Sequence, residues 1–148
     1  MDISQKIVDP ILVALINGIG SIEDFNRDSD KLFEYLYSNN FRTEIAGPLV
    51  GIFYTEFGGR YKTAIPIKKI ILVPDPIQIQ NLPKITCLSL VHQGSWKTIN
   101  NSFEKIKRYE EENNIAWQFP VREVYLKSDG DEKDYRTEIQ VSINQIRA

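Results

Sequence analysis

The sequence contains a weak internal repeat, and this repeat restricts the fold more than any single motif does. The segment GPLVGIFYT around Pro48 matches FPVREVYLK around Pro120, at a shift of 72 residues. Further along, YKTAIPI from Tyr61 matches YRTEIQV from Tyr135, at a shift of 74. Helix candidates match at a similar shift, so three blocks in one order predict two copies of one supersecondary unit. The copies are expected at about residues 8–73 and 77–146.

The first copy is expected to have the order strand, helix, strand, strand. Its first strand is ILVALINGI, a run of branched apolar residues. Ser21 and Asp24 follow and can accept hydrogen bonds from the free N–H groups at a helix start. Two further strands, at residues 49–55 and 64–73, flank the segment EFGGRY, in which two glycines allow a tight hairpin.

The second copy repeats this order. ITCLSLVH is its first strand, a helix follows with apolar residues about one turn apart, and VREVYL and YRTEIQVSI are its last two strands. The proline-interrupted segment VPDPIQIQNLPK is expected to connect the copies. The predicted fold class is therefore α+β, with two pseudo-symmetric βαββ units, antiparallel sheets, one helix backing each sheet, and a ligand cleft between the units.

Glu123 lies at the centre of one predicted strand, between two residues that favour burial. Because side chains alternate between the faces of a strand, Glu123 and Tyr125 share one face. Val124 and Leu126 on the other face are purely apolar. We therefore expect the face of Val124 and Leu126 to pack on the helix, and Glu123 and Tyr125 to point the other way.

The repeat extends this argument to the first copy. The shift of 72 pairs Glu123 with Gly51 and Tyr125 with Phe53, so the first copy offers a space and an aromatic ring on the equivalent face. Two such faces would form a cleft with aromatic walls and one carboxylate at its floor. Such a cleft suits a planar, apolar and often cationic ligand.

Composition limits the class of protein. With 148 residues, of which 42% are hydrophobic, the chain can form one domain with a core of its own. The net charge is −2 with both signs interspersed, which argues against direct nucleic-acid binding. The N-terminal segment has no basic stretch and only a short apolar run, so we expect a cytoplasmic protein without membrane contact. Cys87 is the single cysteine and is expected in the core.

Several residues with chemical potential are expected to have ordinary structural roles. His92 is the only histidine, and no cysteine is spaced to bind a metal with it, so a structural or rim role is expected and no metal or other cofactor. Glu138 shares a face with Arg136 and Gln140, which indicates a solvated set. The charge run EKIKRYEEENN is expected to be a solvated helix face.

Three segments of the second copy, LVHQGSWKTINNSFEKI, REVYLKSDG and YRTEIQVSI, resemble the GyrI-like small-molecule-binding domain. This module binds effectors in gyrase-inhibitory proteins and in many MerR- and AraC-type regulators. The resemblance covers the second copy closely and the first loosely. The family commonly has a histidine, a glycine and an aromatic residue where a strand leads into a helix, and His92, Gly94 and Trp96 stand at these places. Tryptophan replaces the more usual tyrosine, and Ser95 replaces a frequent proline.

The resemblance implies a glutamate at the base of an aromatic pocket for cationic, hydrophobic compounds, and this glutamate falls on Glu123. Regulators of the family carry a helix-turn-helix domain ahead of the module. Here the repeat begins within about the first ten residues, so we expect a stand-alone form. The residues expected to contact the ligand are Glu123, Tyr125, Phe53, Gly51, Trp96, Tyr61 and Tyr135.

Two alternatives to simple ligand binding stay open. Some stand-alone relatives are reported as hydrolases of strained, cyclopropane-containing electrophiles, and Glu123 could assist such a reaction by orienting a water or stabilising developing positive charge. A third hypothesis is contact with a protein partner, as in gyrase inhibition, with a vestigial cleft. A homodimer is also compatible with the sequence.

Overall fold

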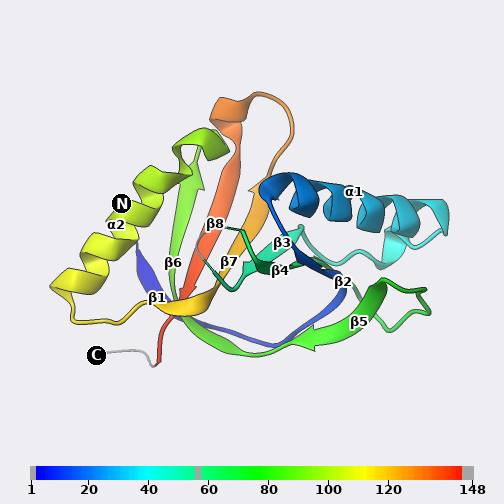
Figure 1. Ribbon diagram of the computed structural model, residues 1–148, viewed down its shortest axis with the longest axis horizontal. Helices are drawn as coiled ribbons and strands as arrows, with labels where there is room; N and C mark the ends of the chain where they lie inside the picture. Colours follow the sequence, from blue (N-terminus) through cyan, green and yellow to red (C-terminus); the bar gives the residue numbers. More distant parts are fainter. Residues whose placement is uncertain (1–2, 56–57, 145–148) are drawn as a thin grey trace. The chain divides into compact units, whose positions relative to one another are not determined.

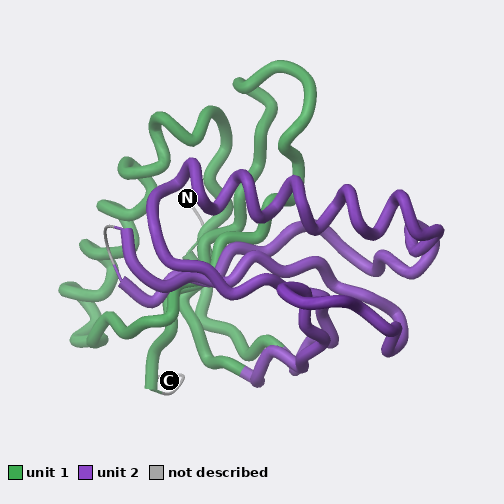
Figure 2. Tube along the Cα trace, turned by 45° about the vertical axis from the view of Figure 1, so that its right-hand side comes forward, with its two compact units in different colours: residues 1–8, 85–148 green, residues 9–84 purple. Residues whose placement is uncertain are grey.

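The computed structural model describes residues 3–55 and 58–144. Within these residues the fold is α+β, with eight β-strands, two α-helices and three short 3-10 helices (Figure 1). The chain divides into two compact units (Figure 2). Unit 1 comprises Met1–Val8 and Ile85–Ala148, and unit 2 comprises Asp9–Lys84. No helix in the described part of the chain is long and apolar enough to span a membrane.

Unit 2 has the predicted order strand, helix, strand, strand, followed by one more strand. Its strands are antiparallel and lie in the order β3-β4-β2-β5. The segment VPDPIQIQNLPK, which was expected only to connect the two copies, contains this additional strand, β5. The fourth element also differs from its expected bounds, because it begins at Arg60 and ends at Pro66. The elements of unit 2 are β2 (Ile11–Ile19), α1 (Ile22–Ser38), β3 (Val50–Phe53), β4 (Arg60–Pro66) and β5 (Ile77–Leu82).

Helix α1 begins where the sequence predicts. Ser21 is its N-cap, and the Ser21 side chain accepts from the backbone N–H of Asp24 while the Asp24 carboxylate accepts from the backbone N–H of Ser21. This capping box satisfies two backbone donors at the helix start. The helix buries Leu32 and Leu36 completely against an apolar cluster of β2 and β4 that includes Ile16 and Ile65. A continuous apolar stripe therefore fixes the helix on its sheet.

Unit 1 has the same order of elements, preceded by a short strand that the sequence analysis did not predict. Strand β1 pairs antiparallel with β6, and the strand order is β1-β6-β8-β7. Helix α2 packs Ile106 against Leu88, Leu90 and Ile139 of this sheet. The elements of unit 1 are β1 (Ser4–Val8), β6 (Ile85–Gln93), α2 (Ile99–Glu112), β7 (Gln118–Lys127) and β8 (Arg136–Ser142).

The sequence analysis expected the whole charge run on α2 to be solvated, but one of its residues is buried. Glu110 is only 4% exposed and lies one turn after Ile106 on the buried face of the helix. Burial raises the pKa of Glu110 to about 7, and the charge of Glu111 adds to this effect. The pattern was misleading because Glu110 sits at the helical spacing of a core residue within a strongly charged segment.

The prediction about the faces of β7 is wrong. In the antiparallel register Glu123 lies opposite Ile139, which lies opposite Leu90, so these three side chains share a face. Leu90 and Ile139 pack with α2. Glu123 and Tyr125 are therefore on the helix side of the sheet, whereas Val124 and Leu126 are not on that face.

The opposite face of the unit 1 sheet explains the error. Arg122, only 2% exposed, and Gln140 lie on this face, next to Glu138. The side chain of Glu138 is 13% exposed and forms an ion pair with Lys6 at 2.5 Å, while Ser89 Oγ donates to it at 2.7 Å. The expectation that Glu138 is solvated is therefore also wrong. Hydropathy alone assigns such a polar, buried face to solvent.

Candidate ligand-binding site

Four of the seven predicted ligand residues come together in unit 1. Trp96 belongs to the short helix η2 (Trp96–Thr98), which precedes α2. Its ring meets Tyr125 edge-on at a centroid distance of 5.7 Å and Tyr135 at 5.1 Å. The Trp96 indole N–H donates to Thr137 Oγ1 at 3.0 Å. Glu123 joins this group through Tyr125, whose hydroxyl donates to Glu123 Oε1 at 3.0 Å. We call Glu123, Tyr125, Trp96, Tyr135 and Thr137 the Glu123 cluster.

The carboxylate of Glu123 lies in a poorly solvated setting. Burial raises the pKa of Glu123 above its usual value, and the hydrogen bond from Tyr125 opposes part of this rise. Burial, together with the charge of Glu123, also holds the pKa of Tyr125 well above 10. In the described part of the chain, no lysine or arginine forms an ion pair with Glu123. The cluster thus combines aromatic rings with a carboxylate that forms no ion pair with a cation of the described residues.

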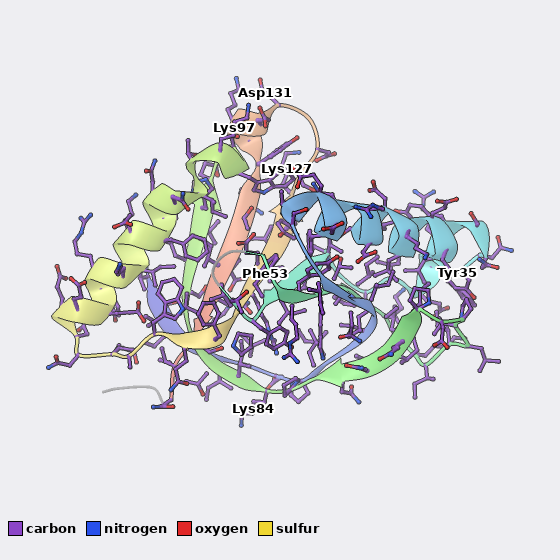
Figure 3. The ribbon with its side chains drawn as sticks, in the orientation of Figure 1. Tyr35, Phe53, Lys84, Lys97, Lys127 and Asp131 are labelled. Atoms are coloured by element: carbon purple, nitrogen blue, oxygen red, sulfur yellow. The ribbon has the colours of Figure 1, made fainter. Side chains whose placement is uncertain are left out.

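The other three predicted residues form a separate group in unit 2. Phe53 of β3, labelled in Figure 3, and Tyr61 of β4 both contact Phe25 of α1, at centroid distances of 5.3 and 5.5 Å. Tyr61 donates from its hydroxyl to Asp28 Oδ2 at 2.6 Å, and burial raises its pKa. The space expected above Gly51 is filled. A Cβ at this position would lie 2.7 Å from the Phe53 ring and 3.0 Å from the Phe25 ring.

His92 has the structural role that the sequence indicates. It is 5% exposed, and its ring nitrogens lie 2.6 Å from Ser102 Oγ and 3.0 Å from the Ser95 carbonyl oxygen. These partners belong to the turn and helix that follow β6. Among the described residues, no group of three histidine, cysteine, aspartate or glutamate side chains could hold a metal ion. Cys87 is completely buried as expected, and burial raises its pKa to about 11.

The turns η2 and η3 (Glu132–Asp134) lie at the same end of unit 1, where Figure 3 labels Lys97 and Asp131. Ser95 Oγ donates to Glu132 Oε1 at 3.4 Å across this end. The Gly94 backbone N–H donates to the Tyr135 carbonyl at 2.7 Å. The backbone that carries Trp96 is thus tied to the start of β8.

Sequence reasoning missed Thr137 and Asp28 as partners of the predicted aromatic residues. A signal for Thr137 was present, because the shift of 74 pairs Thr63 with Thr137. Both threonines are completely buried on strands, where an apolar residue would be the default. The hydroxyl of Thr63 bonds to Ser29 of α1, and that of Thr137 accepts from Trp96 of η2. Asp28 has no such signal, since an aspartate on a helix surface is commonplace.

The family model of the GyrI-like small molecule binding domain matches residues 1–144. The chain belongs to this family. No curated protein matches the sequence. The GyrI-like assignment agrees with the fold of several solved structures, all at low sequence identity.

The C-terminal domain of EcmrR is 16% identical to this GyrI-like chain and has a TM-score of 0.78, with 98% of each chain covered. EcmrR in a complex with DNA has a TM-score of 0.82 at 13% identity, and this chain spans 58% of its length. A hydrolase encoded by lin2189 from Listeria innocua has a TM-score of 0.75 at 10% identity, covering 96% of this chain and 91% of its own.

SAV2435 bound to tetraphenylphosphonium has a TM-score of 0.60 at 13% identity, covering 97% of this chain and 94% of its own. At these identities the likenesses show a shared fold. The chain is accordingly a GyrI-like small-molecule-binding domain, and the nature of its ligand must be argued from its own residues.

Proposed function

We propose that this domain binds small cationic aromatic molecules at the Glu123 cluster. The observation that carries the proposal is the Glu123 carboxylate, which burial desolvates and no cation of the described residues offsets. A carboxylate in such a setting is costly in its charged form unless a positive charge neutralises it. A cationic ligand supplies that positive charge, so its binding offsets the unfavourable free energy of the buried carboxylate.

The aromatic residues of the cluster add a second reason for a cation. The Trp96 ring contacts the rings of Tyr125 and Tyr135 within 6 Å, and Trp96 remains 42% exposed. A cation over an aromatic face gains about 0.5–1 kcal/mol when exposed and about 2 kcal/mol when desolvated, with tryptophan the best partner. Flat aromatic groups of the ligand would pack against the same rings.

The solved relative SAV2435 supports the proposal, since its bound ligand, tetraphenylphosphonium, is a cation with four phenyl groups. That observation concerns SAV2435, and it indicates which class of compound to test on this domain. Contact of the ligand with Gly51, Phe53 and Tyr61 stays a prediction, as does the cleft between the two repeats.

A thermal-shift experiment with tetraphenylphosphonium tests the proposal. A ligand present at 100 times its Kd stabilises the native state by about 2.7 kcal/mol, which raises the midpoint of this small protein by several degrees. We expect this rise for the wild type and for Glu112→Gln, which removes an exposed glutamate of α2. Glu123→Gln should show little rise. Equal rises in all three proteins would contradict the proposal.

A hydrolase is the second candidate, and the raised pKa of Glu123 is the observation that favours it. A carboxyl whose pKa moves toward neutrality can both accept and return a proton near pH 7. The fold is shared with a Listeria innocua hydrolase. Incubation with a cyclopropane-containing electrophile, followed by mass spectrometry, separates the two functions. Turnover that Glu123→Gln abolishes would establish the enzyme, whereas recovery of intact compound supports binding alone.

A further inference from the structure

Trp96 is the most exposed ring of the Glu123 cluster, and its position depends on the turn that carries it. We infer that His92 is the positioning residue that holds Trp96 against Tyr125. His92 acts through the carbonyl oxygen of Ser95. The effect on ligand affinity rests on the proposed function, but the effect on Trp96 itself does not.

The hydrogen bonds of His92 fix the tautomer of its ring. Nε2 lies 3.0 Å from the Ser95 carbonyl oxygen, which can only accept, and 3.2 Å from Thr98 Oγ1. Because the Thr98 hydroxyl donates its own proton to the Ser95 carbonyl, both neighbours of Nε2 are acceptors, and Nε2 carries the proton. Nδ1 of the neutral ring is then an acceptor, and Ser102 Oγ at 2.6 Å donates to it. The buried ring thus links the first turn of α2 to the backbone of the preceding turn.

The acceptor atom is what connects His92 to the ligand site. The Ser95 carbonyl belongs to the peptide group that joins Ser95 to Trp96. Because a peptide group is planar, a fixed carbonyl direction also fixes the N–Cα bond of Trp96 and limits where its side chain can point. The backbone N–H and the Oγ1 hydroxyl of Thr98 donate to the same oxygen at 3.1 and 2.9 Å, so His92 is one of three donors to this carbonyl.

The residue before this turn makes such a restraint necessary. Gly94 has φ +111, a conformation that only glycine adopts readily, and a Cβ at Gly94 would meet no atom within 4 Å. Glycine permits a wide range of backbone directions where the strand β6 ends, although the Gly94 N–H itself is bonded to the Tyr135 carbonyl. The bonds to Ser95 select one direction, in which the Trp96 indole N–H reaches Thr137 Oγ1.

Amide side chains separate the two hydrogen bonds of His92. Glutamine places its amide nitrogen near the position of Nε2, so His92→Gln keeps a donor to Ser95. Asparagine places its oxygen near the position of Nδ1, so His92→Asn keeps the acceptor for Ser102 and loses the donor. If His92 positions Trp96 through Ser95, His92→Gln should resemble the wild type, and His92→Asn and His92→Leu should not.

The test uses a Trp117→Phe background, because the chain has two tryptophans. Proton–nitrogen NMR then shows a single indole N–H, that of Trp96. Without any ligand, we expect this N–H to exchange with water about tenfold faster in His92→Asn and His92→Leu than in the parent, and at the parent rate in His92→Gln. Tetraphenylphosphonium affinity should fall about tenfold in the same two variants.

Parent-like exchange in a folded His92→Leu protein, or rescue by asparagine and not by glutamine, would overturn the inference. Thr98→Val provides a second arm that keeps His92 itself, although Thr98 Oγ1 also lies 3.2 Å from His92 Nε2. It removes one of the three donors to the Ser95 carbonyl and should accelerate indole exchange by a smaller factor. If the His92 variants do not fold, an unchanged indole exchange rate in Thr98→Val also counts against the inference. If indole exchange is faster in the His92 variants than in the parent, but the parent binds no tetraphenylphosphonium, the positioning role is supported and the proposed function is refuted.

Discussion

Glu110 should make the stability of the protein fall as the pH rises through neutrality. The carboxyl of Glu110 has a pKa of about 7 in the folded state, against an ordinary value of 4.5, because burial disfavours its charged form. Between these two values the folded state binds more protons than the unfolded state. The free energy of unfolding contributed by this group is thus largest below about pH 4.5 and is lost by about pH 7.

The size of the effect follows from the same two numbers. A pKa change from 4.5 to about 7 corresponds to about 3 kcal/mol at full weight. We expect about 2 kcal/mol, because only one of the two Glu110 carboxylate oxygens is completely buried without a partner. Glu110→Gln has nearly the same shape and no charge. It should be more stable than the wild type by about 2 kcal/mol at pH 8 and nearly equal at pH 4.5.

Urea unfolding at pH 4.5, 6 and 8 measures this difference. Glu112→Gln, which removes an exposed glutamate of the same helix, is the matched control and should differ little from the wild type at any pH. Lys107 lowers and Glu111 raises the pKa of Glu110, so both residues must be left intact. A stability difference between Glu110→Gln and wild type that does not change with pH would refute the reasoning.

Three further predictions concern the sites of the two units. Affinity for tetraphenylphosphonium should rise as the pH rises through the elevated pKa of Glu123, and Glu123→Gln should remove this dependence in calorimetric titrations from pH 5 to 8. Gly51→Ala should cost about 1–3 kcal/mol in urea unfolding, because the new Cβ would lie 2.7 Å from the Phe53 ring; Phe53→Leu added to it should recover part of the loss. Thr137→Val should speed exchange of the Trp96 indole N–H, and an unchanged rate would show that Thr137 is not its acceptor in solution.

Much of the fold could be predicted because its local signals agree with its packing. The capping box at Ser21 marks the start of α1, and the apolar stripe that follows is the stripe that packs. The repeat supplied the order of elements for both units. Strands β1 and β5 were missed for a physical reason. Both are short and occupy outer positions, where pairing on one side needs no strong apolar pattern.

The faces of β7 could not be predicted, because the buried residues of one face are polar. Arg122, Gln140 and Glu138 look like solvent-facing residues in the sequence, yet Arg122 and Gln140 are buried, and Glu138 is held by an ion pair with Lys6 and a hydrogen bond from Gln140. Glu123 and Tyr125 were nevertheless placed together correctly, since residues two apart on a strand share a face whichever face it is. The position of Trp96 against them came from the family resemblance and not from periodicity.

The central claim is that the charge of Glu123 recognises the charge of the ligand, and a calorimetric cycle tests it most directly. Wild type and Glu123→Gln are each titrated at pH 8 with tetraphenylphosphonium and with triphenylphosphine oxide, which is aromatic and neutral. We expect Glu123→Gln to weaken binding of the cation at least about tenfold and binding of the neutral compound by no more than about twofold, a coupling of about 1 kcal/mol or more. Equal losses for both compounds, or no loss for either, would contradict it.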